Sequence, residues 1–122
     1  MMLHEQNVVL GKEGEEEAKK YLEARGYVCL DQNHRSGMGE IDLVMEKNGT
    51  IVFVEVKSGY TKDNFSPLYR VGFAKQRKLQ MLGQEYLMRY NEPKAAQFDV
   101  VCVEKEPFDT RIMHYQNVIH AL

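Results

Sequence analysis

The sequence predicts an α/β domain in which one helix precedes three strands, a second helix and a further strand. Three observations predict this fold class. Residues 11–25 are rich in Glu, Lys, Ala and Leu, which favour helices, and Gly26 follows at a C-terminal cap position. The dipeptide Asn48-Gly49 lies between two apolar runs and is a strong signal for a β-hairpin. Residues 71–90 carry an apolar stripe at helical spacing and end before Pro93.

The other elements follow from turn residues and from runs of β-branched and aromatic residues. In chain order they are a short strand at 27–30, a polar loop at 31–39, two strands within 40–57 joined across 47–50, an irregular segment at 58–70, a strand at 98–103 and a further strand at 112–115.

The composition fits one ordinary globular domain spanning residues 1–122, with 43% hydrophobic and 28% charged residues. The longest uninterrupted apolar run has four residues, so we expect no membrane span and a cytoplasmic location. Cys29 and Cys102 stand alone, which predicts free thiols rather than a structural zinc site.

The formal net charge of −2 argues against a general affinity for phosphate. The charge is uneven, because residues 70–94 contain six basic and two acidic residues. This asymmetry is compatible with a nucleic-acid contact and equally with a solvated helix face.

The hairpin brings charged residues into register. If its turn is centred on the Asn-Gly dipeptide, Asp42 faces Glu55 and Glu40 faces Lys57, and all four side chains lie on the same side. Opposed carboxylates destabilise a sheet by roughly a few tenths of a kcal/mol or more. A divalent cation such as Mg²⁺, with the Lys57 ammonium beside it, would remove this repulsion. The alternative is a solvent-facing hairpin in which Glu40 and Lys57 form a cross-strand salt bridge.

The opposite side of the hairpin is predicted to be uniformly apolar and to pack on a helix or another layer. It consists of Ile41, Leu43, Met45, Val52, Val54 and Val56. Toward the turn, the charged side also becomes apolar through Val44, Ile51 and Phe53. The polar end of the hairpin is therefore expected to form the rim of a cleft.

Each helix places one charged residue near its apolar stripe. Glu15 lies at the edge of the first stripe, where its carboxylate needs a cation or a donor unless it snorkels to solvent. Lys75 lies within the second stripe, near the helix start, with Lys78 beside it. From there a lysine can reach a phosphate or pair with a carboxylate.

Several segments together resemble the bacterial YraN-like family. They are GKEGEEEAKKYL at 11–22, Asn33-x-Arg35, GEIDLV at 39–44, FVEVK at 53–57, Lys75-x-x-Lys78-Leu79 and QFDVV at 97–101. This family is placed in the PD-(D/E)XK nuclease superfamily and is similar to archaeal Holliday-junction resolvases. The resemblance covers about residues 11–103.

The resemblance implies a restriction-endonuclease-like core, with a helix, a three-stranded antiparallel meander, a helix and a strand in a mixed central sheet. It also implies hydrolysis of DNA phosphodiesters that depends on Mg²⁺ or Mn²⁺. By this resemblance Asp42 and Glu55 bind the metal together with the Val56 carbonyl, and Lys57 positions the attacking water. Glu15 completes the outer shell of the ion or holds a second ion.

The resemblance adds Glu40 as a further acidic candidate and assigns Lys75, Lys78 and Arg35 to DNA phosphates. An enzyme that cuts branched DNA is expected to act as a homodimer. Two alternatives stay open: a non-hydrolytic module that docks on nucleic acid or protein, and a hydrolase of RNA or nucleotides. Retention of the three hairpin residues favours the enzyme, since a binding module has no need for two repelling carboxylates.

Overall fold

The computed structural model confirms the α/β fold class and describes residues 3–60 and 72–119. Within these residues the order is a helix, a three-stranded antiparallel meander, a helix and two strands. The elements are α1 (Leu3–Glu23), β1 (Val28–Ser36), β2 (Gly39–Lys47), β3 (Thr50–Tyr60), α3 (Phe73–Leu87), β4 (Ala96–Glu106) and β5 (Asp109–Ile119).

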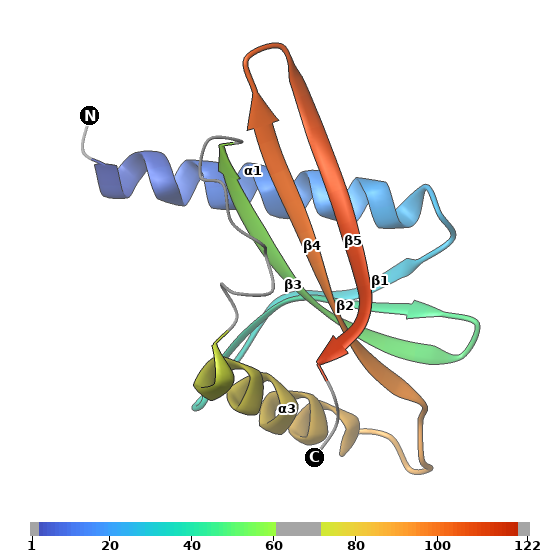
Figure 1. Cartoon of the computed structure of the whole chain (residues 1–122). Helices are drawn as coiled ribbons and strands as arrows, with labels where there is room; N and C mark the ends of the chain where they lie inside the picture. Colours follow the sequence, from blue (N-terminus) through green and yellow to red (C-terminus); the bar gives the residue numbers. More distant parts are fainter. Residues whose placement is uncertain (1–2, 61–71, 120–122) are drawn as a thin grey trace.

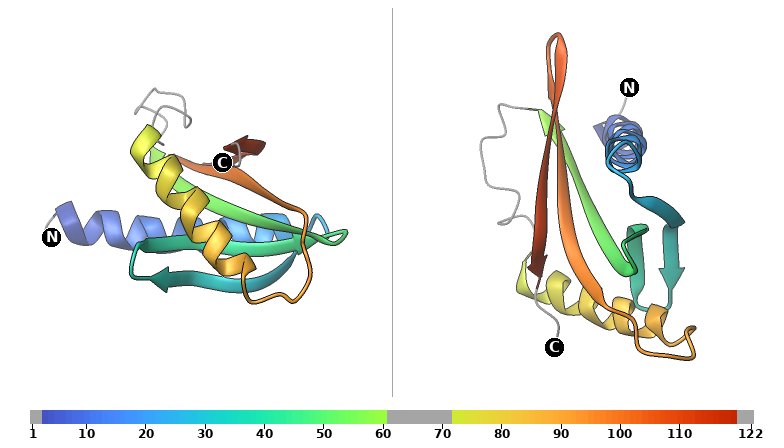
Figure 2. Two further views of the ribbon diagram at one scale, coloured as in Figure 1. Left: turned by 90° about the horizontal axis from the view of Figure 1, so that it is seen from below. Right: turned by 90° about the vertical axis from the view of Figure 1, so that its right-hand side faces the viewer.

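The five strands form one mixed sheet in the order β1-β2-β3-β4-β5 (Figure 1). Neighbouring strands are antiparallel except β3 and β4, which are parallel and are joined through α3. The helix α1 crosses one face of the sheet and contacts mainly β3 and β4, whereas α3 lies at the other side and contacts β2 (Figure 2). No helix in the described part of the chain is long and apolar enough to cross a membrane.

The predicted hairpin is present in the predicted register. Lys47 pairs with Thr50, and the ladder continues to Leu43 and Val54. The two turn residues Asn48 and Gly49 have positive φ angles of 51° and 80°. Both angles lie in the left-handed region that a two-residue hairpin of this kind requires, which is why the Asn-Gly pair gives a reliable signal.

The first strand differs most from the prediction. Most of the short strand expected at 27–30 and most of the polar loop expected at 31–39 form one strand, β1, which pairs with β2 up to Ser36 and Gly39. A register shift between Cys29 and Asp31 interrupts the pairing. Because β1 is an edge strand, none of its residues is fully buried and most of them are polar, so its sequence resembles that of a loop.

Other boundaries also differ from the predicted ones. The helix expected at 71–90 spans Phe73–Leu87, and β5 is longer than the strand expected at 112–115. Residues 58–60, expected to be irregular, continue β3. The rest of that predicted irregular segment, together with residue 71, lies outside the described residues.

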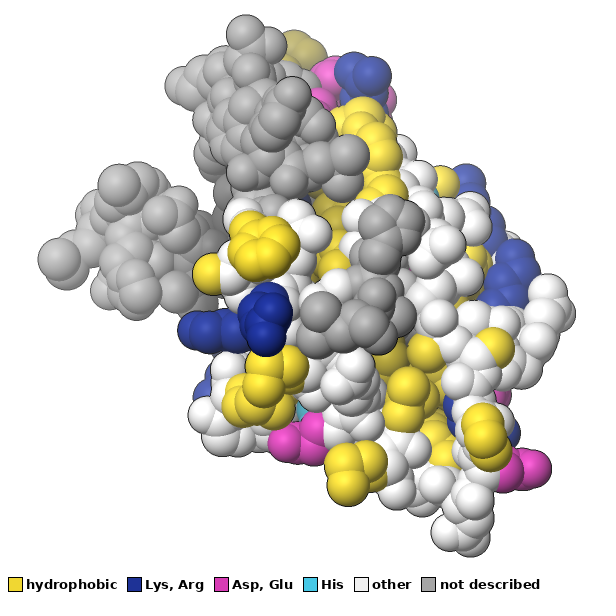
Figure 3. Space-filling model, turned by 60° about the horizontal axis from the view of Figure 1, so that its bottom comes forward, with side chains coloured by type: hydrophobic (Ala, Val, Ile, Leu, Met, Phe, Trp, Pro, Cys, Tyr) yellow, Lys and Arg dark blue, Asp and Glu magenta, His cyan; other side chains and the backbone are white. Residues whose placement is uncertain are grey.

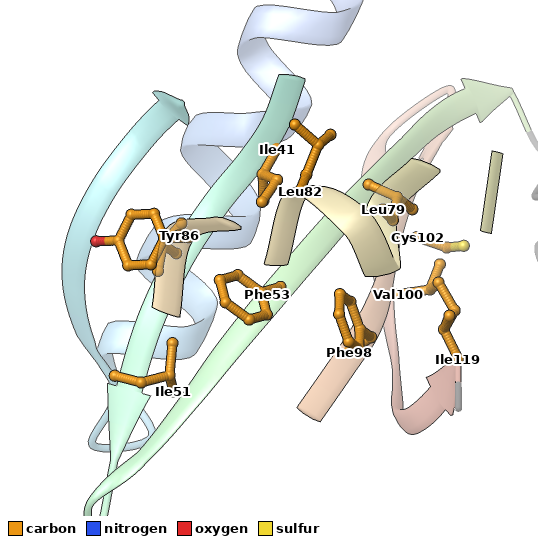
Figure 4. Packing of buried hydrophobic residues seen from close by; sticks show 11 residues of the cluster. Ile41, Ile51, Phe53, Leu79, Leu82, Tyr86, Phe98, Val100, Cys102 and Ile119 are labelled. Atoms are coloured by element: carbon orange, nitrogen blue, oxygen red, sulfur yellow. The ribbon is translucent and has the colours of Figure 1, made fainter. Parts of the chain in front are cut away.

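The outer side of α3 is exposed and carries a mixture of apolar and charged side chains (Figure 3). Its inner side is buried through Leu79, Leu82, Gly83 and Tyr86. These residues pack on β2, β3 and β4 around Phe53 and Phe98 (Figure 4). A second cluster, built on Ala18 and Leu22 of α1, covers the other face of the sheet through Leu43, Met45, Val52, Val54, Val101 and Val103.

One residue of the predicted apolar face lies elsewhere. Leu43 and Met45 pack beneath α1 as predicted, but Ile41 belongs to the cluster beneath α3, close to Leu82 (Figure 4). The alternation of faces breaks between Ile41 and Leu43, where β2 leaves β3. Strand periodicity alone cannot anticipate such a break. Neither Cys29 nor Cys102 forms a disulfide.

Two glycines allow a test of helix packing. A Cβ at Gly83 would lie 2.7 Å from Phe98 Cζ and 3.0 Å from Phe53 Cε2, whereas a Cβ at Gly11 meets nothing within 4 Å. We expect Gly83→Ala to lower the free energy of unfolding by roughly 1–3 kcal/mol through overpacking. Gly11→Ala should raise it by up to about 1 kcal/mol, because alanine favours helices. Urea unfolding of both variants measures this difference, and equal effects would contradict the packing described.

A candidate metal centre where two strands part

The candidate site lies where β2 and β3 separate. Their described pairing ends at Leu43 and Val54, and the next residues in the same register are Asp42 and Glu55. Beyond this point β2 stays paired with β1, and β3 stays paired with β4, so the two halves of the sheet diverge (Figure 1). The Val56 amide donates a hydrogen bond of 2.8 Å to Asp42 Oδ2 instead of continuing the ladder. The fork therefore opens a space between the strands and directs the Asp42 carboxylate into it.

Three carboxylates meet at this fork. Glu15, Glu40 and Asp42 each offer one oxygen, and these oxygens all lie within 4.8 Å of one another. The Asn33 side-chain amide donates to Glu15 Oε2 and to Glu40 Oε1, at 2.8 Å in each case. Arg35 Nε lies 3.1 Å from Glu40 Oε2. Asn33 thus links the carboxylate from α1 to one of the two from β2.

A fourth carboxylate, Glu55, is held by two lysines. Its side chain is only 4% exposed. Its Oε1 atom lies 2.8 Å from Lys75 Nζ and 3.3 Å from Lys57 Nζ. Its other oxygen, Oε2, is buried and has no hydrogen-bond partner among the described residues. A buried carboxylate oxygen without a partner is unfavourable unless a cation or donor comes to it.

A cavity of about 360 Å³ borders these groups. Acidic side chains of β2 and basic side chains of α3 line it, together with apolar residues from both elements. Its described lining consists of Met38, Gly39, Glu40, Asp42, Lys75, Lys78, Leu79 and Leu82. Asp42 and Lys75 line this cavity directly, and the ammonium of Lys75 also binds the buried carboxylate of Glu55.

The electrostatics reflect an excess of acid. Burial, followed by the charges of Glu55 and Glu15, raises the pKa of Asp42 to about 8, although the Val56 amide and Lys75 oppose the shift. Burial also raises the pKa of Glu15, against the Asn33 hydrogen bond. Asp42 therefore tends to hold a proton near neutral pH that a metal ion can replace.

The pKa of Lys75 is also raised, but by neighbouring acidic groups and not by burial. Burial alone would lower its pKa, but the hydrogen bond and charge of Glu55, with the charges of Asp42 and Glu40, outweigh burial and raise it. Its ammonium is therefore firmly charged at neutral pH. Lys75 thus keeps a fixed positive charge at Glu55. Among the described ion pairs, the group of Glu15, Glu40 and Asp42 is reached by Arg35, whose side chain is 80% exposed.

The structure brings most of the predicted site residues together. Glu15 turns toward Glu40 and Asp42, as the helix periodicity predicts. The sequence left open whether Lys75 contacts a phosphate or pairs with a carboxylate, and in the structure it pairs with the carboxylate of Glu55. Lys78 lines the cavity.

One predicted contact is wrong. Glu40 does not face Lys57, because the β2–β3 ladder ends before those residues. Among the described ion pairs, Glu40 is joined to Arg35 of β1 and Lys57 to Glu55 of its own strand. The proposed cross-strand salt bridge is therefore absent from the described residues, and Arg35 is engaged with a site carboxylate.

Asn33 is the site residue whose role the sequence did not reveal. It stands in a segment predicted as loop, and only its position in β1 brings its amide between two carboxylates. Its φ angle of 52° lies in the left-handed region, which asparagine tolerates better than most residues. Its presence in the Asn33-x-Arg35 segment was the one available signal.

The donor set fits a hard divalent ion. Opposite ligands of an octahedral Mg²⁺ ion lie about 4.2 Å apart, since each bond is about 2.1 Å. Adjacent ligands lie about 3.0 Å apart, so the three carboxylate oxygens, which lie within 4.8 Å of one another, must move closer together to bind one ion directly. Because Mg²⁺ usually takes only one or two carboxylates and several waters, part of this set would act through water.

Comparison with known proteins shows that the chain matches a protein family. The model of the uncharacterised protein family UPF0102 matches residues 14–103. The chain is similar to UPF0102 protein STH1475 of Symbiobacterium thermophilum, with 41% identity over 114 residues, covering 92% of this chain and 97% of the relative. It is also similar to a UPF0102 protein of Syntrophus aciditrophicus, with 42% identity over 108 residues, covering 88% and 85%.

The raised pKa of Asp42 predicts a pH-dependent stability in the metal-free protein. A carboxyl group whose pKa is higher in the folded state favours folding below about pH 4 and loses this contribution as the pH rises toward 8. Asp42→Asn removes the titration while its amide oxygen can still accept from Val56. In EDTA, we expect the variant to be more stable than wild type at pH 8 by on the order of 2 kcal/mol. At pH 5 most of this difference should be gone.

Thermal melts at several pH values measure this effect. Glu13→Gln is a matched control, because Glu13 lies on the exposed side of α1. Parallel pH profiles for wild type and Asp42→Asn would show that Asp42 is not protonated in the fold near neutral pH.

Proposed function

Because the chain belongs to the uncharacterised protein family UPF0102, we propose its function from the site: a metal-dependent phosphodiester hydrolase acting on DNA, with branched or otherwise structured DNA favoured. One observation carries the proposal. Four carboxylates and two lysines meet where β2 and β3 part, beside a cavity. This combination supplies both a place for a divalent ion and fixed positive charge for a phosphate.

Asp42 is the central candidate ligand. Its carboxylate lies beside those of Glu15 and Glu40, and burial, together with the charges of Glu55 and Glu15, raises its pKa. The buried Oε2 of Glu55 is a further candidate, because no described group satisfies it. A bound Mg²⁺ or Mn²⁺ ion supplies an acidified water and neutralises charge on the phosphate.

The two lysines act beside Glu55. Lys57 and Lys75 both hold its Oε1 atom, which fixes that carboxylate and leaves Oε2 free to turn toward a ligand. Lys57 is mostly buried, so its ammonium acts where water screens it poorly. We assign Lys57 to positioning the attacking water and to stabilising negative charge on the phosphate.

Lys75 and Lys78 are assigned to phosphates of the substrate. Both line the cavity, and Lys75 is 49% exposed, so it can contact a bound strand from the side of Glu55. Contacts to phosphates fix the position of a protein along the DNA but do not give it a sequence preference. With a net charge of −2, the protein should bind plain duplex DNA weakly, which favours substrates recognised by shape.

Cleavage assays test the proposal. With Mg²⁺ or Mn²⁺ we expect wild type to cut at least one of supercoiled, single-stranded, flap or four-way-junction DNA. Asp42→Ala and Lys57→Ala should each lower the rate at least about 100-fold, because each removes a group that acts in the reaction. Binding of the same DNA should persist in both variants. Glu13→Gln is again the control and should cut like wild type.

The alternatives give different outcomes. Equal cleavage by wild type and both alanine variants would identify a contaminating nuclease and contradict the proposal. DNA or protein binding without cleavage under any metal condition would favour a non-catalytic module. Cleavage confined to RNA or nucleotides, with the same dependence on Asp42, would keep the chemistry and change the substrate.

A further inference from the structure

We propose that the outer face of α3 is a two-fold interface between two copies of this chain. In this pair the two α3 helices run antiparallel, with Met81 of each copy at the symmetry axis. The proposal goes beyond the function assigned above and does not depend on it, because it rests on residues outside the candidate site.

The outer face of α3 carries large apolar side chains that nothing in the described chain covers. Phe73 and Met88 are each 81% exposed, and Met81 is 41% exposed. Figure 3 shows apolar side chains on this side of the molecule, with basic and acidic side chains between them. Several large apolar residues on one helix face are typical of a surface that meets a partner.

The charged residues of this face are spaced symmetrically about Met81. At about 100° per residue, Ala74, Arg77, Glu85 and Met88 all lie within about 40° of Met81 around the helix axis. All five residues are exposed. One basic and one acidic residue thus stand four positions before and four positions after the central methionine.

A second copy fits this pattern. In an antiparallel pair centred on Met81, whose helices cross so that their rows of residues four apart lie along each other, a residue a given number of positions before Met81 faces the residue the same number after it in the other copy. Arg77 then faces the partner's Glu85, and Glu85 faces the partner's Arg77. Met81 meets its own symmetry mate, and Phe73 approaches the partner's Arg89. Opposite charges therefore meet twice around an apolar centre, which is the self-complementarity that a two-fold interface requires.

Among the described residues of one chain, these two charges have no such partner. Arg77 and Glu85 are eight residues apart, which places them about 12 Å apart along the helix. No described ion pair includes either residue. A parallel helix pair would place like residues opposite each other and would bring the two Arg77 side chains together, so the charges select the antiparallel arrangement.

One helix face is a small interface. It buries less than the roughly 800 Å² per partner of a standard complex, so we expect a weak dimer with a dissociation constant in the micromolar range. The arrangement also separates the two Lys75 residues by about 18 Å along the helix axes. If the proposed function holds, the two sites are then spaced on the scale of a DNA duplex.

Charge reversal at two positions tests the interface by sedimentation equilibrium at concentrations up to about 0.5 mM. Wild type should show a monomer–dimer equilibrium. Arg77→Glu places two acidic pairs across the axis and Glu85→Arg places two basic pairs, so each variant alone should dimerise at least about tenfold more weakly. An equimolar mixture of the two variants restores both opposite-charge pairs. It should form heterodimers within about threefold of the wild-type affinity.

The controls carry the same charge changes on another exposed helix face. Lys12→Glu and Glu13→Arg lie on α1 and should leave the equilibrium unchanged. Circular dichroism confirms that every variant is folded. The proposal is overturned if wild type stays monomeric throughout, if either reversed variant dimerises like wild type, or if the mixture is as weak as its components.

Discussion

The hydrogen bond from the Val56 amide to Asp42 Oδ2 is the interaction on which the candidate site depends. Where the β2–β3 ladder ends, the Val56 amide still needs an acceptor, and a side-chain carboxylate replaces the carbonyl of a neighbouring strand. Because the carboxylate serves as the acceptor, the two strands can separate without leaving the Val56 amide unsatisfied. The hydrogen bond also fixes the carboxylate of Asp42 in the fork, where α1 brings Glu15 and α3 brings Lys75.

The charged side chains at the fork form two groups, one around Glu55 and one around Asp42. Glu55 forms ion pairs with Lys57 and Lys75. Among the described ion pairs, the group of Glu15, Glu40 and Asp42 is reached by the exposed Arg35, and its other donors are the neutral amides of Asn33 and Val56. The raised pKa values of Asp42 and Glu15 follow from this imbalance and from burial. Such a site is unfavourable in the free protein and becomes favourable when a cation enters, which is typical of functional sites.

Local signals in the sequence predicted a good part of this arrangement. The Asn48-Gly49 turn predicted the register that places Asp42 and Glu55 next to each other at the end of the ladder. The helical periodicity of α1 predicted that Glu15 points toward the sheet. The length of β1, the change of face at Ile41 and the end of the ladder were not predictable. All three depend on how helices on opposite sides pack against the sheet, which involves residues far apart in the chain. For the same reason the Glu40–Lys57 contact was predicted wrongly and the role of Asn33 was missed.

We propose that the fork between β2 and β3 is a metal site built around Asp42. Crystals soaked in MnCl₂ and measured near the manganese absorption edge test it directly. We expect an anomalous peak about 2.1–2.3 Å from an oxygen of Asp42, bordered by Glu15, Glu40 or Glu55, and no peak there in Asp42→Asn crystals. Manganese bound only elsewhere, or an equal peak at the fork in the variant, would contradict it.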